Sequence, residues 1–150
     1  MELMVVLIVA GIVLTFALPA FSGYRNDLKL RQARQQLLED IRLARQEAVT
    51  RRAPVFIQFG GGTTTTGITS YQIHVDTNGN SLSDAGERRM IRTLPSSTSL
   101  SSALVPNDTL AFDVSGILWP GAGGGTLILR NARDRRDTLV VSTAGIVYKP

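Results

Sequence analysis

The residues whose spacing most resembles a chemical site form the polar stretch 76–87, DTNGNSLSDAGE. Oxygen-bearing side chains stand there at the places that hold calcium in an EF-hand loop: Asp76, Asn78, Asn80, Asp84 and Glu87. The glycine expected at the sixth place is Ser81, and neither flank has a helical pattern. The dipeptide Asn-Gly and the tripeptide Asp-Ala-Gly are good turn formers. We therefore predict a structural turn without a metal, and keep a weak calcium site as the alternative.

A second candidate site is a cluster of arginines near the C-terminus, formed by Arg130, Arg133, Arg135 and Arg136. The chain carries 16 Lys and Arg against 12 Asp and Glu, a formal net charge of +4. Several arginines together can bind the phosphates of nucleic acid. Asp134 and Asp137 interrupt this cluster, and aromatic residues are scarce around it. The cluster is therefore either a DNA-binding patch or a solvated hairpin.

Catalysis is not expected from this sequence. His74 is the only histidine, and it falls on the polar face of a predicted strand at 69–75. The glycine runs at 60–62 and 123–125 lack the lysine and the helix that a phosphate-binding loop needs. The absence of cysteine excludes disulfides, thiol catalysis and cysteine-based metal sites. We predict neither an enzyme nor a bound cofactor.

Glu2 is an acid at the edge of a long apolar run, since no charge occurs from Leu3 to Leu18. Such a run is long enough to lie across most of a bilayer as a helix. A carboxylate at the centre of a bilayer costs roughly 3 kcal/mol, and less near its surface. Glu2 therefore needs a cationic partner or must reach the lipid headgroups. A simple membrane anchor is one interpretation of this segment.

The elements that position these residues begin with a helix predicted over residues 1–52. Its first part, 1–24, is hydrophobic, and Gly11 and Pro19 should let it bend or melt more easily than its surroundings. Its second part, 25–53, is amphipathic and should pack on the rest of the chain through an apolar stripe: Leu30, Ala33, Leu37, Ile41, Ala44 and Ala48. Pro54 ends the helix.

Residues 54–150 should form a β-rich head. Alternating patterns and turn signals predict short strands at 55–59, 69–75, 88–94, 109–113, 116–119, 126–130, 137–142 and 145–148. The stretches 60–67, 95–102 and 121–125 should be loops, and residues 142–145 a hairpin turn. The predicted fold class is α+β: a long N-terminal α-helix packed against an antiparallel β-sheet head in meander order.

The opening MELMVVLIVAGIVLTFALPAF resembles the N-terminal segment of type IV pilins and type II secretion pseudopilins. The rest of the chain resembles the FimT/GspH-type minor pilins and pseudopilins. The pieces that carry this resemblance are RQEAVTRRAPV, VDTNGNSLSDAGER, FDVSG, GGTLIL and LVVSTAGIV. Together they extend over nearly the whole chain.

This resemblance implies roles for three residues of the apolar segment. Glu2 matches the acid that pairs with the N-terminal amine of a neighbouring subunit during assembly. The part from Gly11 to Pro19 matches the part of the helix that often loses regular structure in pili. The family also has a basic leader that a prepilin peptidase removes after a glycine, followed by methylation. Neither that leader nor that glycine precedes Met1 here, so the true N-terminus stays open.

The function expected from residues and resemblance together is a structural subunit of a type IV pilus-like or type II secretion pseudopilus filament. The expected partners are copies of itself or other pilins, the assembly machinery and the inner membrane. Before assembly the head would lie in the periplasm, and afterwards in a periplasmic or extracellular filament. The head type favours a minor pilin or pseudopilin. The alternatives are a DNA-binding minor pilin and a monomeric anchored periplasmic domain.

Overall fold

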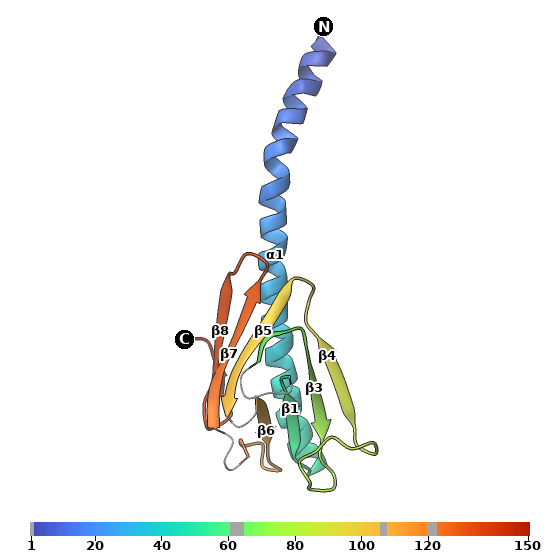
Figure 1. Cartoon of the computed structure of the whole chain (residues 1–150), viewed down its shortest axis with the longest axis vertical. Coiled ribbons are helices and arrows are strands. Elements are labelled where there is room, and N and C mark those ends of the chain that lie inside the picture. The colour runs from blue at the N-terminus through green and yellow to red at the C-terminus, as the bar shows by residue number, and fades with distance from the viewer. Residues whose placement is uncertain (1, 61–64, 106–107, 120–122) are drawn as a thin grey trace.

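The computed structural model describes residues 2–60, 65–105, 108–119 and 123–150, without the side chains of residues 13–21, 65, 105 and 123. One long helix precedes a head of short strands (Figure 1). In chain order, the elements are α1 (Glu2–Arg51), β1 (Val55–Gln58), β2 (Thr65–Ile68), β3 (Ser70–Val75), β4 (Arg89–Thr93), β5 (Thr98–Val105), β6 (Thr109–Phe112), β7 (Gly123–Asn131), β8 (Arg136–Val141) and β9 (Val147–Tyr148).

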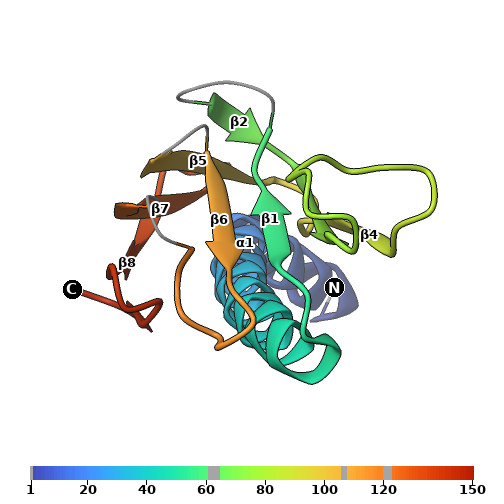
Figure 2. The same ribbon diagram turned by 90° about the horizontal axis from the view of Figure 1, so that it is seen from below.

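The strands form two antiparallel sheets rather than one. Sheet A has the order β4-β3-β1-β6, and sheet B has the order β2-β5-β7-β8-β9. Seen along α1, the two sheets lie over one side of the helix and leave its opposite side open (Figure 2). The α+β fold class is thus confirmed. The predicted meander order is wrong, because the chain passes between the two sheets and β1 pairs with both β3 and β6.

Four predictions for segments of the head are wrong. Residues 98–105 form β5, although 95–102 was expected to be a loop, and β7 begins at Gly123 within the glycine run. Residues 116–119 make an isolated bridge between Leu118 and Phe112 instead of a strand. In the expected loop at 60–67, residues 65–67 belong to β2 and residues 61–64 lie outside the described part. Residues 121–122 of the expected loop at 121–125 also lie outside it. The turn at 142–145 is confirmed by a hydrogen bond from the Gly145 N–H to the Ser142 carbonyl.

The core lies between α1 and the inner faces of both sheets. Six residues of the predicted apolar stripe are buried: Leu30, Ala33, Leu37, Ile41, Ala44 and Ala48. Burial recurs every three or four residues because that spacing returns to one face of an α-helix. The sheets contribute Ile57, Phe112 and Leu129, each fully buried. Alanine at the C-terminal end of the stripe lets the sheets approach the helix closely.

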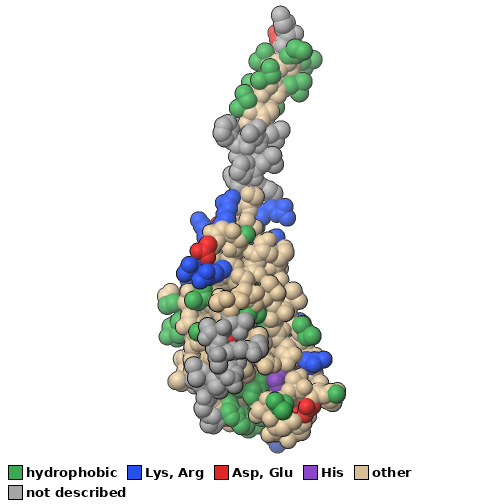
Figure 3. Space-filling view, in the orientation of Figure 1, with side chains coloured by type: hydrophobic (Ala, Val, Ile, Leu, Met, Phe, Trp, Pro, Cys, Tyr) green, Lys and Arg blue, Asp and Glu red, His purple; other side chains and the backbone are tan. Residues whose placement is uncertain are grey.

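The first half of α1 extends away from the head (Figures 1 and 3). Its described apolar side chains are exposed, from 81% at Leu3 to 55% at Ile12. Within the described part of the chain, no helix is both long and apolar enough to cross a membrane. The helix is continuous through Gly11 and Pro19. Loss of helix there on assembly stays a prediction, and Met1 lies outside the described residues.

Candidate functional site

The free end of α1 is the first candidate site. Glu2 is exposed, in the first turn of the helix, and far along α1 from the first buried core residue, Leu30. The described apolar side chains that follow it, from Leu3 to Ile12, are exposed. An uncovered apolar surface of this kind is unusual on a soluble protein and indicates a surface that another protein or a lipid covers. The role of Glu2 in assembly stays a prediction.

A buried polar cluster fastens α1 to sheet A. The Tyr71 hydroxyl donates a hydrogen bond of 2.6 Å to Asp40 Oδ2, and Arg92 Nε donates one of 3.2 Å to Oδ1. Asp40 and Tyr71 are 4% and 2% exposed. Burial and the neighbouring Asp40 carboxylate raise the pKa of Tyr71 above its usual value, so the hydroxyl stays a donor. The sequence signal for this cluster is an acid, Asp40, inside the apolar stripe.

The arginine cluster lies where the β7–β8 turn meets α1. Arg135 donates to Asp27 at 2.9 Å, and the Asn131 side chain donates to the same carboxylate at 3.2 Å. Arg130 and Arg136 both pair with Asp134, at 3.4 and 3.2 Å. Arg133 reaches Ser22 at 3.4 Å. Arg133 and Arg135 therefore hold the head on the helix, whereas Arg130 and Arg136 pair within their own turn. Basic side chains gather at this junction in Figure 3.

The stretch 76–87 forms a loop closed by its own carboxylates. Buried Asp76 accepts hydrogen bonds from the N–H groups of Gly79 and Ser81. Asp84 accepts from the side-chain amides of two asparagines, which lowers its pKa. Glu87 accepts from the N–H groups of Thr77 and Asp84. Among the described residues no group of three or more His, Cys, Asp or Glu side chains is arranged to hold a metal ion. The carboxylates act as turn-forming acceptors.

Replacing Asp76 with alanine is expected to lower the free energy of unfolding by about 2 kcal/mol, because two N–H groups lose their acceptor. Chelation of calcium should leave the stability of the wild-type protein and of the Asp76→Ala variant unchanged. Urea unfolding with and without EDTA measures both effects. A calcium-dependent rise in the stability of the wild-type protein would support the metal site instead.

The placement of His74 on a polar, solvent-facing surface is wrong. His74 is 3% exposed, and its ring stacks on Phe56 with centroids 5.1 Å apart. The Trp119 ring also contacts Phe56, with ring centroids 6.3 Å apart. Neither ring nitrogen of His74 has a hydrogen-bond partner among the described residues. Burial lowers the pKa of His74 below its usual 6.5, although the nearby carboxylates of Glu87 and Asp76 oppose the shift.

This burial predicts acid sensitivity. The folded pKa of His74 lies below the unfolded value of 6.5, so the unfolded chain binds more protons as the pH falls through 6.5. The free energy of unfolding should then fall by up to about 1.4 kcal/mol per pH unit until the folded pKa is reached. The substitution His74→Phe should remove this part of the pH dependence of the free energy of unfolding. Urea unfolding from about pH 8 to about pH 5 tests it, and parallel curves for the two proteins would contradict it.

One half of the long helix has exposed apolar side chains, and its other half packs against two antiparallel sheets. This arrangement defines a pilin-like fold. A family model described as Type II transport protein GspH matches residues 33–145. The chain therefore belongs to the GspH family, and its resemblance to type IV pilins and type II secretion pseudopilins is confirmed. No curated protein sequence matches the chain significantly.

Solved structures share the fold at low sequence identity. The type IV minor pilin FimU of Pseudomonas aeruginosa matches with a TM-score of 0.61 and 21% identity, over 85% of this chain and 92% of that one. A second crystal form of FimU matches with a TM-score of 0.56 and 22% identity, over 80% of this chain and 91% of that one. The minor pseudopilin EpsH of the Vibrio cholerae Type 2 Secretion System matches with a TM-score of 0.54 and 14% identity, over 81% of this chain and 96% of that one.

Proposed function

We propose that this protein is a non-enzymatic subunit of a pilus or pseudopilus filament and that it assembles through the first half of α1. The observation that carries this proposal is the contrast between the two halves of the helix. The half beginning at Leu30 supplies the head's buried stripe, whereas the apolar side chains from Leu3 to Ile12 are exposed on the part of α1 that extends away from the head (Figure 1). Burying that apolar surface among neighbouring helices would drive assembly.

The proposal gives Glu2 a partner. A carboxylate that enters an apolar helix bundle is costly unless a cation pairs with it. The N-terminal amine of a neighbouring subunit is such a cation and would set the axial position of one helix against the next. The same segment would hold the protein in the inner membrane before assembly, with the head in the periplasm, because Leu3 to Leu18 carries no charge. A prepilin peptidase and an assembly machinery would prepare and build the filament.

Membership of the GspH family favours a pseudopilus of a type II transport system, while FimU shares the fold in a type IV pilus. The DNA-binding alternative has less support, because Arg130, Arg135 and Arg136 pair with Asp134 or Asp27. An assembly role therefore explains more of the molecule than a nucleic-acid role.

Co-purification tests this proposal. The tagged full chain should appear in filaments sheared from the cells that make it. Residues 25–150, which contain every buried apolar side chain of the described core, should fold but stay out of the filaments. Equal recovery of both proteins in the filament fraction would exclude assembly through α1.

A further inference from the structure

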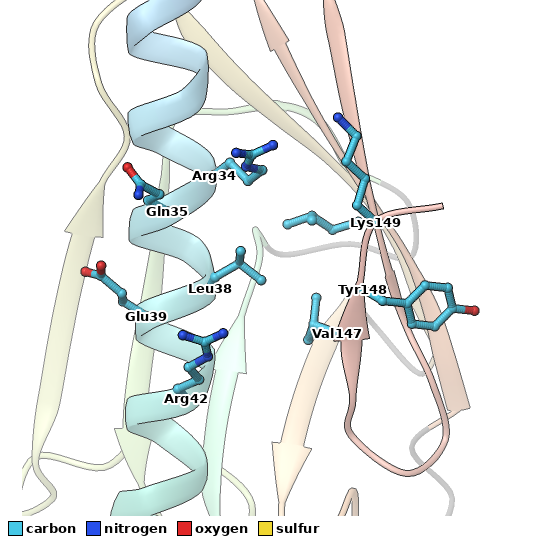
Figure 4. Close-up of a pocket in the computed structure, with 9 residues that line it drawn as sticks. Arg34, Gln35, Leu38, Glu39, Arg42, Val147, Tyr148 and Lys149 are labelled. Atoms are coloured by element: carbon cyan, nitrogen blue, oxygen red, sulfur yellow. The ribbon is translucent and has the colours of Figure 1, made fainter.

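Sheet B leaves one side of α1 uncovered beyond β9. The sheet ends at β9, a strand of two residues that pairs only with β8. Between this edge and α1 lie two adjoining cavities of about 370 and 210 Å³, which share Leu38, Arg42 and Val147 in their walls. Figure 4 shows Arg34, Leu38 and Arg42 projecting from α1 toward the C-terminal strands, while Tyr148 points away from the helix. We call this space the β9 groove.

The walls of the β9 groove combine an apolar floor with cationic rims. Leu38 and Val147 form the floor, and Ile146, 58% exposed, continues it at one end. Four cations line the groove: Arg34, Arg42, Arg45 and Lys149. Glu39 is the one acid among the described lining residues. Arg42 and Arg45 have no carboxylate partner in the described part of the chain, so the groove presents unbalanced positive charge.

The edge of β9 is open for pairing. Natural sheets often block such an edge with an outward lysine. Here Lys149 turns instead to the buried carboxylate of Asp137, at 3.1 Å, which Arg34 also contacts at 3.1 Å. Two exposed residues beside the edge, Ile146 and Tyr148, are apolar or aromatic. An extended chain could therefore add its backbone to β9 and place alternate side chains against α1.

We infer that the β9 groove binds an extended, carboxylate-bearing segment of a neighbouring filament subunit. Its backbone pairs with β9, an apolar side chain covers Leu38 and Val147, and its carboxylates meet Arg42 and Arg45. Charge complementarity selects an acidic segment, because a basic one would meet like charges on both rims. This inference rests on the proposed filament role and adds a contact made by the head.

Photocrosslinking in assembled filaments tests the inference. A benzophenone amino acid replaces Ile146 in the full chain, and Ile91 serves as the matched control. Ile91 is 66% exposed and lies on β4, an edge strand of sheet A. We expect an adduct from position 146 to another filament subunit, with a crosslinked peptide of net negative charge. The double substitution Arg42→Glu and Arg45→Glu should reduce this adduct about tenfold, whereas Arg89→Glu should not.

Recovery of the chain in sheared filaments is measured in the same samples. A chain that is recovered in filaments but gives no more adduct at 146 than at 91 would overturn the groove inference and leave the filament role standing. An adduct to DNA or phospholipid, a basic crosslinked peptide, or an adduct unaffected by the two charge reversals would also overturn it. A chain absent from filaments would contradict both proposals.

Discussion

Replacing Glu2 with alanine should remove most of the protein from filaments while leaving the head folded. In an apolar helix bundle, the substitution would leave the amine of the neighbouring subunit without its partner, which costs about 3 kcal/mol or more. That cost corresponds to about a hundredfold loss of incorporation. Glu2 is exposed in the isolated protein and lies outside the described core, so folding should not change.

Immunoblotting of the sheared filament fraction measures this loss, and thermal unfolding of the same variant checks the head. Glu39→Ala is the matched control, because Glu39 is an exposed acid farther along the same helix. It should assemble normally, because Glu39 lies beyond the apolar segment and, although it lines the β9 groove, the contacts proposed there are made by Arg42 and Arg45. Unchanged incorporation of Glu2→Ala would remove the assembly role from this carboxylate.

Replacing Asp40 with alanine should have the largest effect on the stability of the head, about 3 kcal/mol. The buried Tyr71 hydroxyl would lose its acceptor, and Arg92 would lose the carboxylate that ties β4 to α1. Glu39→Ala, one position earlier and exposed, should cost about 0.5 kcal/mol or less. Urea unfolding of residues 25–150 compares the two variants.

A double-mutant cycle of Asp40→Ala with Tyr71→Phe separates the hydrogen bond from general packing effects. The loss of stability in the double variant should be smaller than the sum of the two single losses, because both substitutions remove the same contact. Equal stability of Asp40→Ala and Glu39→Ala would mean that the buried cluster does not hold the helix to sheet A.

The helix could be predicted from the sequence because its signals are local. The apolar stripe from Leu30 to Ala48 follows the helical repeat, and Pro54 marks its end. β5 was missed because its buried side includes polar residues, Thr98 and Ser102, which hide the alternation. The start of β7 was missed because its glycines indicate a loop.

In the structure these glycines allow close packing between strands. A Cβ on Gly124 would lie 2.2 Å from the Val141 carbonyl oxygen, and one on Gly125 would lie 2.3 Å from that of Ala103. Such contacts depend on which strands become neighbours, and the sequence does not reveal that. The burial of His74 was not predicted for the same reason, since His74 stacks on Phe56 of the neighbouring strand β1, and Phe56 in turn contacts Trp119.

The candidate sites also differ in whether local sequence signals reveal them. Glu2 stands out in the sequence because it is an acid beside a long apolar run. The β9 groove could not be predicted, because it depends on β9 being the last strand of sheet B and on sheet B ending beside α1. The arginine cluster was found, but its pairing with Asp27 requires the docking of the β7–β8 turn on the helix.

The first half of α1 should be buried in the filament while the head faces solvent. The chain has no cysteine, so single cysteines report on chosen positions without interference. The variants Ile8→Cys and Thr77→Cys place one thiol on the apolar helix and one on the exposed loop of the head. Maleimide labelling in sheared filaments should modify position 77 and spare position 8. Equal labelling of both positions in filaments that contain the protein would contradict the account.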